Sequence, residues 1–108
     1  MTIEPGDIRW FRFSRPDKRR PVLVLGRPEL LRAWSLVPVI PLSTQARGLP
    51  WEVRLGAADG LASDCVLKVE WVYSVERHRL VALLTTIPDQ RWTEVRAAVL
   101  YAFGLDRP

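Results

Sequence analysis

The spacing of apolar and polar positions predicts that most of this chain forms short β-strands. Strand-like patterns occupy residues 8–13, 37–42, 51–55 and 79–85. Residues 21–25 are aliphatic after an initial proline, which is typical of a central strand buried on both faces.

The longest pattern covers residues 65–76 and predicts one continuous strand with a single face in the core. Lys68 and Glu70 fall side by side on the other face, which this periodicity turns outward. The predicted core face consists of Cys65, Leu67, Val69, Trp71, Tyr73 and Val75.

Turn and cap residues indicate how these segments connect. A short basic loop between residues 8–13 and 21–25 predicts a hairpin. Pro38 and Pro41 lack an amide donor, so we expect their strand at a sheet edge or at a bulge. Residues 56–64 are expected to form a flexible connection.

The C-terminal segment has helical spacing, with apolar residues at positions 92, 95, 99 and 102. Asp89 is the expected N-terminal cap and Gly104 lies where a C-terminal cap belongs. A weaker pattern over residues 28–34 indicates one or two further helical turns. The predicted fold class is mainly β with a C-terminal helix: a small, strongly bent antiparallel sheet or barrel, in a single domain over residues 1–108.

Composition narrows the function classes. One cysteine excludes an internal disulfide, and one cysteine with one histidine excludes the usual zinc sites. A single histidine also excludes a two-histidine ribonuclease mechanism within one chain. No apolar run approaches the roughly 20 residues of a membrane span, and the first residues lack a signal-peptide pattern, so we expect a cytoplasmic protein without a membrane partner. The net charge of +4 favours nucleic acid, a membrane surface or an acidic protein as partner.

Three groups of residues are candidates for chemistry. The first is the basic loop Arg15, Lys18, Arg19 and Arg20, because arginine offers planar donors that match phosphate oxygens. The others are the hydroxyl and amide side chains of Ser43, Thr44 and Gln45, and the pair Lys68 and Glu70. Each group also has an ordinary structural explanation: a solvated hairpin tip, a polar turn and a weak surface ion pair.

Isolated residues are weaker candidates. His78 is expected in a solvated turn and Cys65 as a packed thiol. Periodicity places Trp10, Trp71 and Trp92 in the core, whereas Trp34 and Trp51 flank loops and suit either anchoring or base stacking.

Taken in order, four stretches resemble the MazF/PemK toxins, which are metal-independent endoribonucleases of bacterial toxin–antitoxin pairs. The stretches are residues 5–10 (PGDIRW), residues 19–25 (RRPVLVL), residues 39–53 with their Ser-Thr-bearing loop, and residues 60–61 with 65–80. Their order and spacing, more than any one motif, carry the resemblance, which spans nearly the whole chain.

The resemblance implies a homodimer that cleaves single-stranded RNA without a cofactor and binds an acidic antitoxin. The ribose 2′-hydroxyl would attack the adjacent phosphorus, as in transesterification. By position, Arg20 corresponds to the catalytic arginine, Ser43 to the loop threonine and Glu70 to the acidic residue, here assigned as base. RNA contacts are expected from Lys18, Arg19, Thr44, Gln45 and Lys68.

Two departures from the family pattern leave alternatives open. The loop before Arg20 lacks the usual Gly-Ser-Glu-Gln stretch, and Trp71 stands where a glutamine is usual. A gyrase poison of the same fold, dependent on residues 101–108, is one alternative. A catalytically inactive relative that binds RNA or protein is the other.

Overall fold

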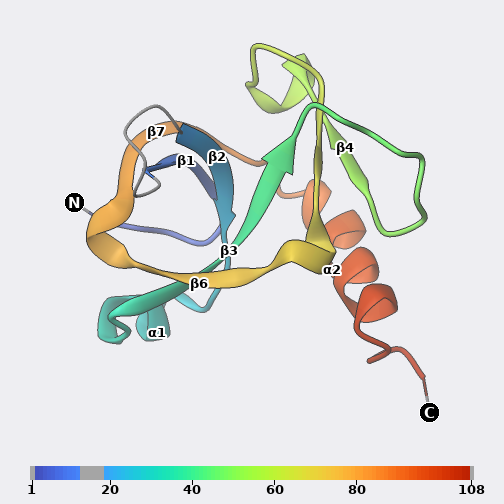
Figure 1. Cartoon of the computed structure of the whole chain (residues 1–108). Helices are drawn as coiled ribbons and strands as arrows, with labels where there is room; N and C mark the ends of the chain where they lie inside the picture. The colour runs from blue at the N-terminus through green and yellow to red at the C-terminus, as the bar shows by residue number, and fades with distance from the viewer. Residues whose placement is uncertain (1, 13–18, 108) are drawn as a thin grey trace.

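The computed structural model describes residues 2–12 and 19–107 and shows a curled antiparallel sheet with a helix at its C-terminal end (Figure 1). The strands of the described part are β1 (Asp7–Arg12), β2 (Arg19–Val24), β3 (Leu36–Ser43), β4 (Val53–Leu55), β5 (Cys65–Leu67), β6 (Tyr73–Glu76) and β7 (Leu80–Thr86). Their order in the sheet is β4-β5-β3-β2-β1-β7, and β6 also pairs with β3. The predicted fold class is confirmed.

The sheet is buried on both faces around β2. Leu23 belongs to one apolar cluster, whereas Val22 and Val24 belong to another on the opposite face, and all three are fully buried. This confirms the central strand predicted from the aliphatic run, and β1 and β2 pair antiparallel as the predicted hairpin.

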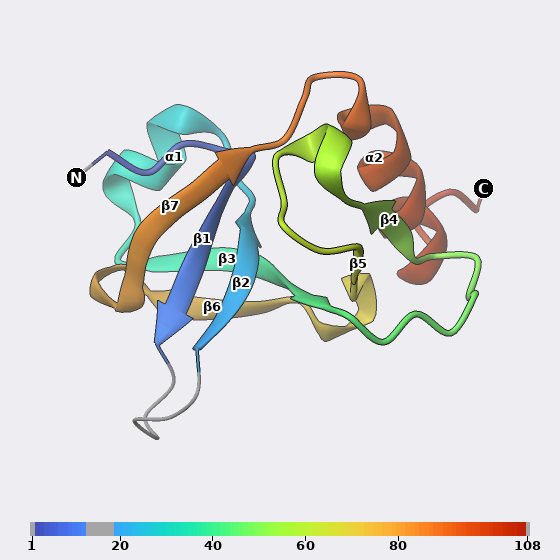
Figure 2. The ribbon, with the colours of Figure 1, turned by 90° about the horizontal axis from the view of Figure 1, so that it is seen from above.

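A helix covers each of the two apolar faces. Helix α2 (Arg91–Ala102) packs with β4 and with the 3-10 turn over Val69–Trp71, and the short helix α1 (Pro28–Ala33) lies at the other end of the sheet (Figure 2). Val95 and Ala98 anchor α2 in the first cluster, and Leu31 anchors α1 in the second. The spacing predicted for the C-terminal helix is confirmed.

The expectation that the proline-bearing strand lies at an edge or at a bulge is wrong, because β3 is central and its pairing with β2, β5 and β6 is regular. Its prolines are tolerated because each lies where a neighbouring strand ends. The carbonyl of Pro38 accepts a hydrogen bond from Leu25, just beyond β2, and the carbonyl of Pro41 accepts one from Lys68, just beyond β5. The amide hydrogens that these prolines lack would therefore point beyond the ends of β2 and β5, where the regular hydrogen bonding of the sheet has already stopped.

The continuous strand predicted over residues 65–76 is also wrong. The chain leaves β5 at Lys68, makes a 3-10 turn over Val69–Trp71, and enters β6 at Tyr73. Lys68 is 2% exposed and Trp71 is 51% exposed, the reverse of the faces that strict alternation assigns. Lys68 and Glu70 therefore do not share an outward strand face.

The ends of α2 differ in how well the sequence predicts them. The N-terminal cap is Gln90 without a side-chain hydrogen bond, so the expected side-chain cap from Asp89 is wrong; Asp89 contributes its backbone carbonyl to the amide of Trp92. At the other end Gly104 has φ of +69°, and the amide of Leu105 bonds the carbonyl of Leu100. This left-handed glycine termination confirms the predicted C-terminal cap.

The connection expected to be flexible holds a 3-10 turn, η1 (Ala57–Asp59), tied to α2. The buried carboxylate of Asp59 accepts hydrogen bonds from Arg91 at 2.7 and 3.1 Å and one from the amide of Gly56. Gly60 follows with φ of +86°, and a Cβ there would lie 2.4 Å from the Thr85 hydroxyl oxygen. Contacts with Arg91 and Thr85, which are distant in sequence, hold residues 56–60 in place, and the local sequence pattern does not reveal them.

Truncating the central strand tests the importance of the two-faced core. We expect Leu23→Ala to lower the free energy of unfolding by about 2–5 kcal/mol, because a fully buried leucine loses its contacts and leaves a cavity. Urea denaturation followed by tryptophan fluorescence measures the change. Leu105→Ala, at a leucine 67% exposed, is the matched control and should change stability by less than about 0.5 kcal/mol.

Candidate functional site

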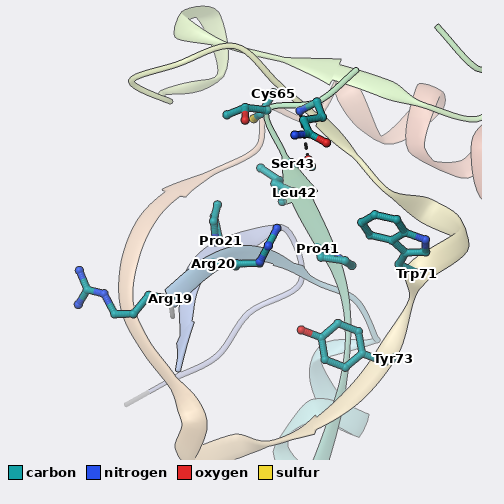
Figure 3. A pocket seen from close by; sticks show the side chains of 11 residues that line it. Arg19, Arg20, Pro21, Pro41, Leu42, Ser43, Cys65, Trp71 and Tyr73 are labelled. Atoms are coloured by element: carbon teal, nitrogen blue, oxygen red, sulfur yellow. Dashed lines mark hydrogen bonds between the residues drawn. The ribbon is translucent and has the colours of Figure 1, made fainter. Parts of the chain in front are cut away.

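A cavity opens where β2 and β3 separate. The last paired residues of these strands are Val22 and Pro41. Extending the same register by two residues places Arg20 opposite Ser43. The space between them measures about 700 Å³, within the range of small-ligand sites. It is lined by Arg19, Arg20, Pro21, Pro41, Leu42, Ser43, Thr44, Gln45, Cys65, Trp71 and Tyr73 (Figure 3).

The wall formed by β2 is cationic. Arg19 and Arg20 are both exposed, and Figure 3 shows Arg19 extending away from the other labelled side chains. The guanidinium of Arg19 lies 5.1 Å from the centre of the Trp10 ring, a cation–π contact that orients it. The described residues that line the cavity include these two arginines and no carboxylate, so its field favours an anion.

The end of β3 supplies the polar wall. The hydroxyl oxygen of Ser43 accepts a hydrogen bond of 3.1 Å from the amide of Gln45, which fixes the first turn of the loop. The hydroxyl hydrogen is still available as a donor. Thr44 and Gln45 are exposed beside it, so the structure brings together in one cavity the predicted site residues Arg19, Arg20, Ser43, Thr44 and Gln45.

An aromatic wall completes the cavity. Trp71 and Tyr73 come from the 3-10 turn and from β6, and Tyr73 packs edge-on against Phe11 with ring centres 6.0 Å apart. Burial raises the pKa of the Tyr73 phenol above its ordinary value, although Arg20 and Arg79 oppose this shift. The phenol is therefore protonated at neutral pH. Period-two reasoning missed both residues because it assigned them to the core.

A buried ion pair lies beneath this wall. The ammonium of Lys68 is 2.6 Å from a carboxylate oxygen of Glu52, and both side chains are 3% exposed. The hydrogen bond from Lys68 lowers the pKa of Glu52 to about 2 against the opposing effect of burial, with help from the amides of Arg47 and Leu49. The predicted role of Lys68 as a contact on an exposed face does not match this placement. Sequence analysis offered no indication of Glu52.

Glu70 lies away from the cavity. It lines a separate hollow of about 640 Å³ with the ring of Trp51, which stacks on Tyr101 at 6.3 Å. The structure therefore does not bring Glu70 together with Arg20 and Ser43. Lys18 and Arg15 belong to residues 13–18, outside the described part of the chain.

Two further candidates have definite places. Cys65 lines the cavity from β5, and burial, together with Asp59 and Asp64, raises the pKa of its thiol, so it is a poor nucleophile. His78 is exposed on a 3-10 turn outside the cavity. In the described ranges no three His, Cys, Asp or Glu residues gather as a metal would require, and no helix there is long and apolar enough to cross a membrane.

Solved structures of MazF proteins share this architecture. A Mycobacterium tuberculosis structure described as toxin MazF-mt6 aligns with a TM-score of 0.84 and 28% identity, covering 93% of this chain and 98% of that chain. A MazE–MazF structure from Deinococcus radiodurans aligns with a TM-score of 0.80 and 27% identity, covering 96% and 97%. The curled half-barrel with a terminal helix thus defines the structural class of the MazF toxins.

Sequence comparison gives the family. The model of the PemK-like, MazF-like toxins of type II toxin–antitoxin systems matches residues 4–103, and the chain belongs to this family. Endoribonuclease MazF3 of M. tuberculosis is 35% identical over 63 residues, 58% of this chain, and the match spans only 61% of that relative's length. A second relative, named probable endoribonuclease MazF2 in the same species, is 31% identical over 86 residues, covering 79% of this chain and 83% of its own.

The Glu52–Lys68 pair predicts a specific pH dependence. Because the pKa of Glu52 is lowered from 4.5 to about 2 in the folded chain, its ionised form stabilises the fold above about pH 4.5, and this contribution is lost as the pH falls toward 2. We expect Glu52→Gln to have a much lower Tm than the native chain at pH 7 and a similar Tm near pH 2. Thermal unfolding by circular dichroism across this range measures the gap. A difference in Tm between the two chains that stays constant from pH 7 to pH 2 would contradict a stabilising role for ionised Glu52.

Proposed function

We propose that this chain is an endoribonuclease that cleaves single-stranded RNA as the toxin of a toxin–antitoxin pair. The observation that carries the proposal is the cavity that holds Arg20 and Ser43 on opposing strands with no carboxylate among its described lining residues. Relatives named endoribonucleases support it. The family match and the names of these relatives do not favour the gyrase-poison or inactive-relative alternatives.

The reaction suited to this cavity is transesterification. Solvent water accepts the proton of the ribose 2′-hydroxyl, and the 2′-oxygen attacks the adjacent phosphorus. The bond from phosphorus to the 5′-oxygen breaks, and the leaving 5′-oxygen takes a proton from solvent water. The products are a 2′,3′-cyclic phosphate and a 5′-hydroxyl. In this scheme Arg20 stabilises the negative charge that builds on the phosphorane, and Ser43 donates a hydrogen bond to a non-bridging oxygen.

The remaining residues of the cavity take supporting roles. Arg19, Thr44 and Gln45 contact the RNA backbone, and Lys68 acts through its ion pair with Glu52 instead of touching phosphate. Glu70 lines a different hollow, so the proposal assigns the principal charge stabilisation to Arg20 and does not depend on Glu70 as base. No cofactor enters this scheme.

The partners in this proposal are a second copy of the chain and an acidic antitoxin. A MazE–MazF structure from D. radiodurans and a mycobacterial endoribonuclease described as bound to its cognate antitoxin support the latter. The net charge of +4 suits an acidic segment that competes with RNA for the arginines. Both encounters would take place in the cytoplasm.

Removing the cationic group tests the proposed chemistry. We expect Arg20→Ala to reduce cleavage of a long single-stranded RNA by about 10²–10³-fold, because an electrostatic donor in the transition state is lost. Ser43→Ala should have a smaller effect in the same direction. The assay is run in EDTA and the ends are mapped for 2′,3′-cyclic phosphates.

Two controls make this result decisive. Arg96→Ala removes an exposed arginine of α2 outside the cavity and should leave cleavage within about twofold of the native rate. Glu70→Gln should behave like Arg96→Ala, and a loss as large as that of Arg20→Ala would return the role of base to Glu70. Absence of cleavage by the folded native chain on several RNAs would refute the nuclease proposal.

A further inference from the structure

Trp71 exposes its indole at the wall of the cavity. The side chain is 51% exposed and lines the cavity from the 3-10 turn between β5 and β6. The buried ammonium of Lys68 lies 5.5 Å from the ring centre. Because this ammonium is held by Glu52, the ring rests on a fixed cation, and its opposite face is the one available to a ligand.

Tyr73 adds an unused hydrogen-bonding group to the same wall. Its hydroxyl oxygen is buried and has no hydrogen-bond partner in the described part of the chain. A buried polar group without a partner costs stability, so it is commonly explained by a ligand or water that completes it. Figure 3 shows the hydroxyl directed toward the side of the cavity on which Arg20 lies.

The two walls together match the two parts of a nucleotide. An exposed aromatic face is suited to stack on a base, and the guanidinium groups of β2 are suited to the phosphate that accompanies it. The polar residues Ser43, Thr44 and Gln45 line the same cavity as the two walls. An acidic peptide would satisfy the arginines but has no requirement for a planar aromatic surface.

We propose that Trp71 and Tyr73 form a base-recognition wall, in which Trp71 stacks on one unpaired RNA base and the Tyr73 hydroxyl bonds the edge of that base. This inference deepens the nuclease proposal and rests on it for the identity of the ligand. It makes the two residues determinants of sequence preference, separate from the chemistry assigned to Arg20.

Binding is measured apart from cleavage with a randomised single-stranded pool that has 2′-deoxyribose throughout, since such strands keep bases and phosphates but lack the attacking hydroxyl. We expect Trp71→Ala to weaken binding by roughly 5- to 100-fold, the cost of one lost base stack. Trp71→Phe, which keeps an aromatic face, should restore most of the affinity. The salt dependence of binding should stay unchanged in Trp71→Ala and become shallower in Arg20→Ala.

The matched control is Trp34→Ala, at a tryptophan 40% exposed at the end of α1 and outside the cavity. It should bind the pool as the native chain does, and near-ultraviolet circular dichroism checks that each variant is folded. Binding by Trp71→Ala within twofold of Trp34→Ala would overturn the proposal. So would an effect of Trp71→Ala confined to an acidic peptide, which would identify a protein ligand instead.

Cleavage of a randomised RNA then tests base recognition directly. Mapped ends should show that Trp71→Ala loses base preference at one position, and Tyr73→Phe should lower kcat/KM for the preferred base by about 2- to 10-fold, the effect of one hydrogen bond. Unchanged preference in both variants would overturn the proposal even where cleavage is normal. If the native chain binds the pool, Trp71→Ala weakens that binding, and the native chain still does not cut RNA, the nuclease proposal would be refuted and the base-recognition wall supported.

Discussion

The buried ion pair between Glu52 and Lys68 is the interaction on which the site depends. Two charges removed from water are stable only when each is fully partnered, and Glu52 meets this condition with the ammonium of Lys68 and the amides of Arg47 and Leu49. The carboxylate thereby links the loop that follows Ser43 to the turn that carries Trp71. Loss of either charge would leave the other buried without compensation.

The same pair lies at the point where the chain departs from a regular strand. Lys68 is buried where it meets Glu52, and Val69 beside it is also fully buried. The strand ends at Leu67, and the 3-10 turn Val69–Trp71 begins directly after Lys68. The turn exposes Trp71 and resets the chain so that β6 directs Tyr73 toward the cavity. A contact in the interior thus sets the position of the surface that meets the ligand.

Local sequence patterns predicted the fold well wherever residues nearby in the sequence determine whether a side chain is buried. The aliphatic strand around Leu23, the hairpin and the C-terminal helix ending at Gly104 all follow from short-range spacing. Arg20 and Ser43 were found as separate stretches, and only the strand register joins them. Trp71 and the burial of Lys68 were missed because they depend on a partner 16 residues away, which no periodicity within one segment reveals. For the same reason nothing in the sequence identified Glu52.

The distribution of charge shows how a small fold keeps a cationic cavity. Asp7 is paired with Arg9, Asp59 with Arg91 and Glu52 with Lys68, and in all three pairs the carboxylate is buried within the structure. Neither Arg19 nor Arg20 takes part in a salt bridge with any described residue. These three carboxylates are held by their own cations and do not line the cavity, and the two arginines of β2 keep their charge for an external anion.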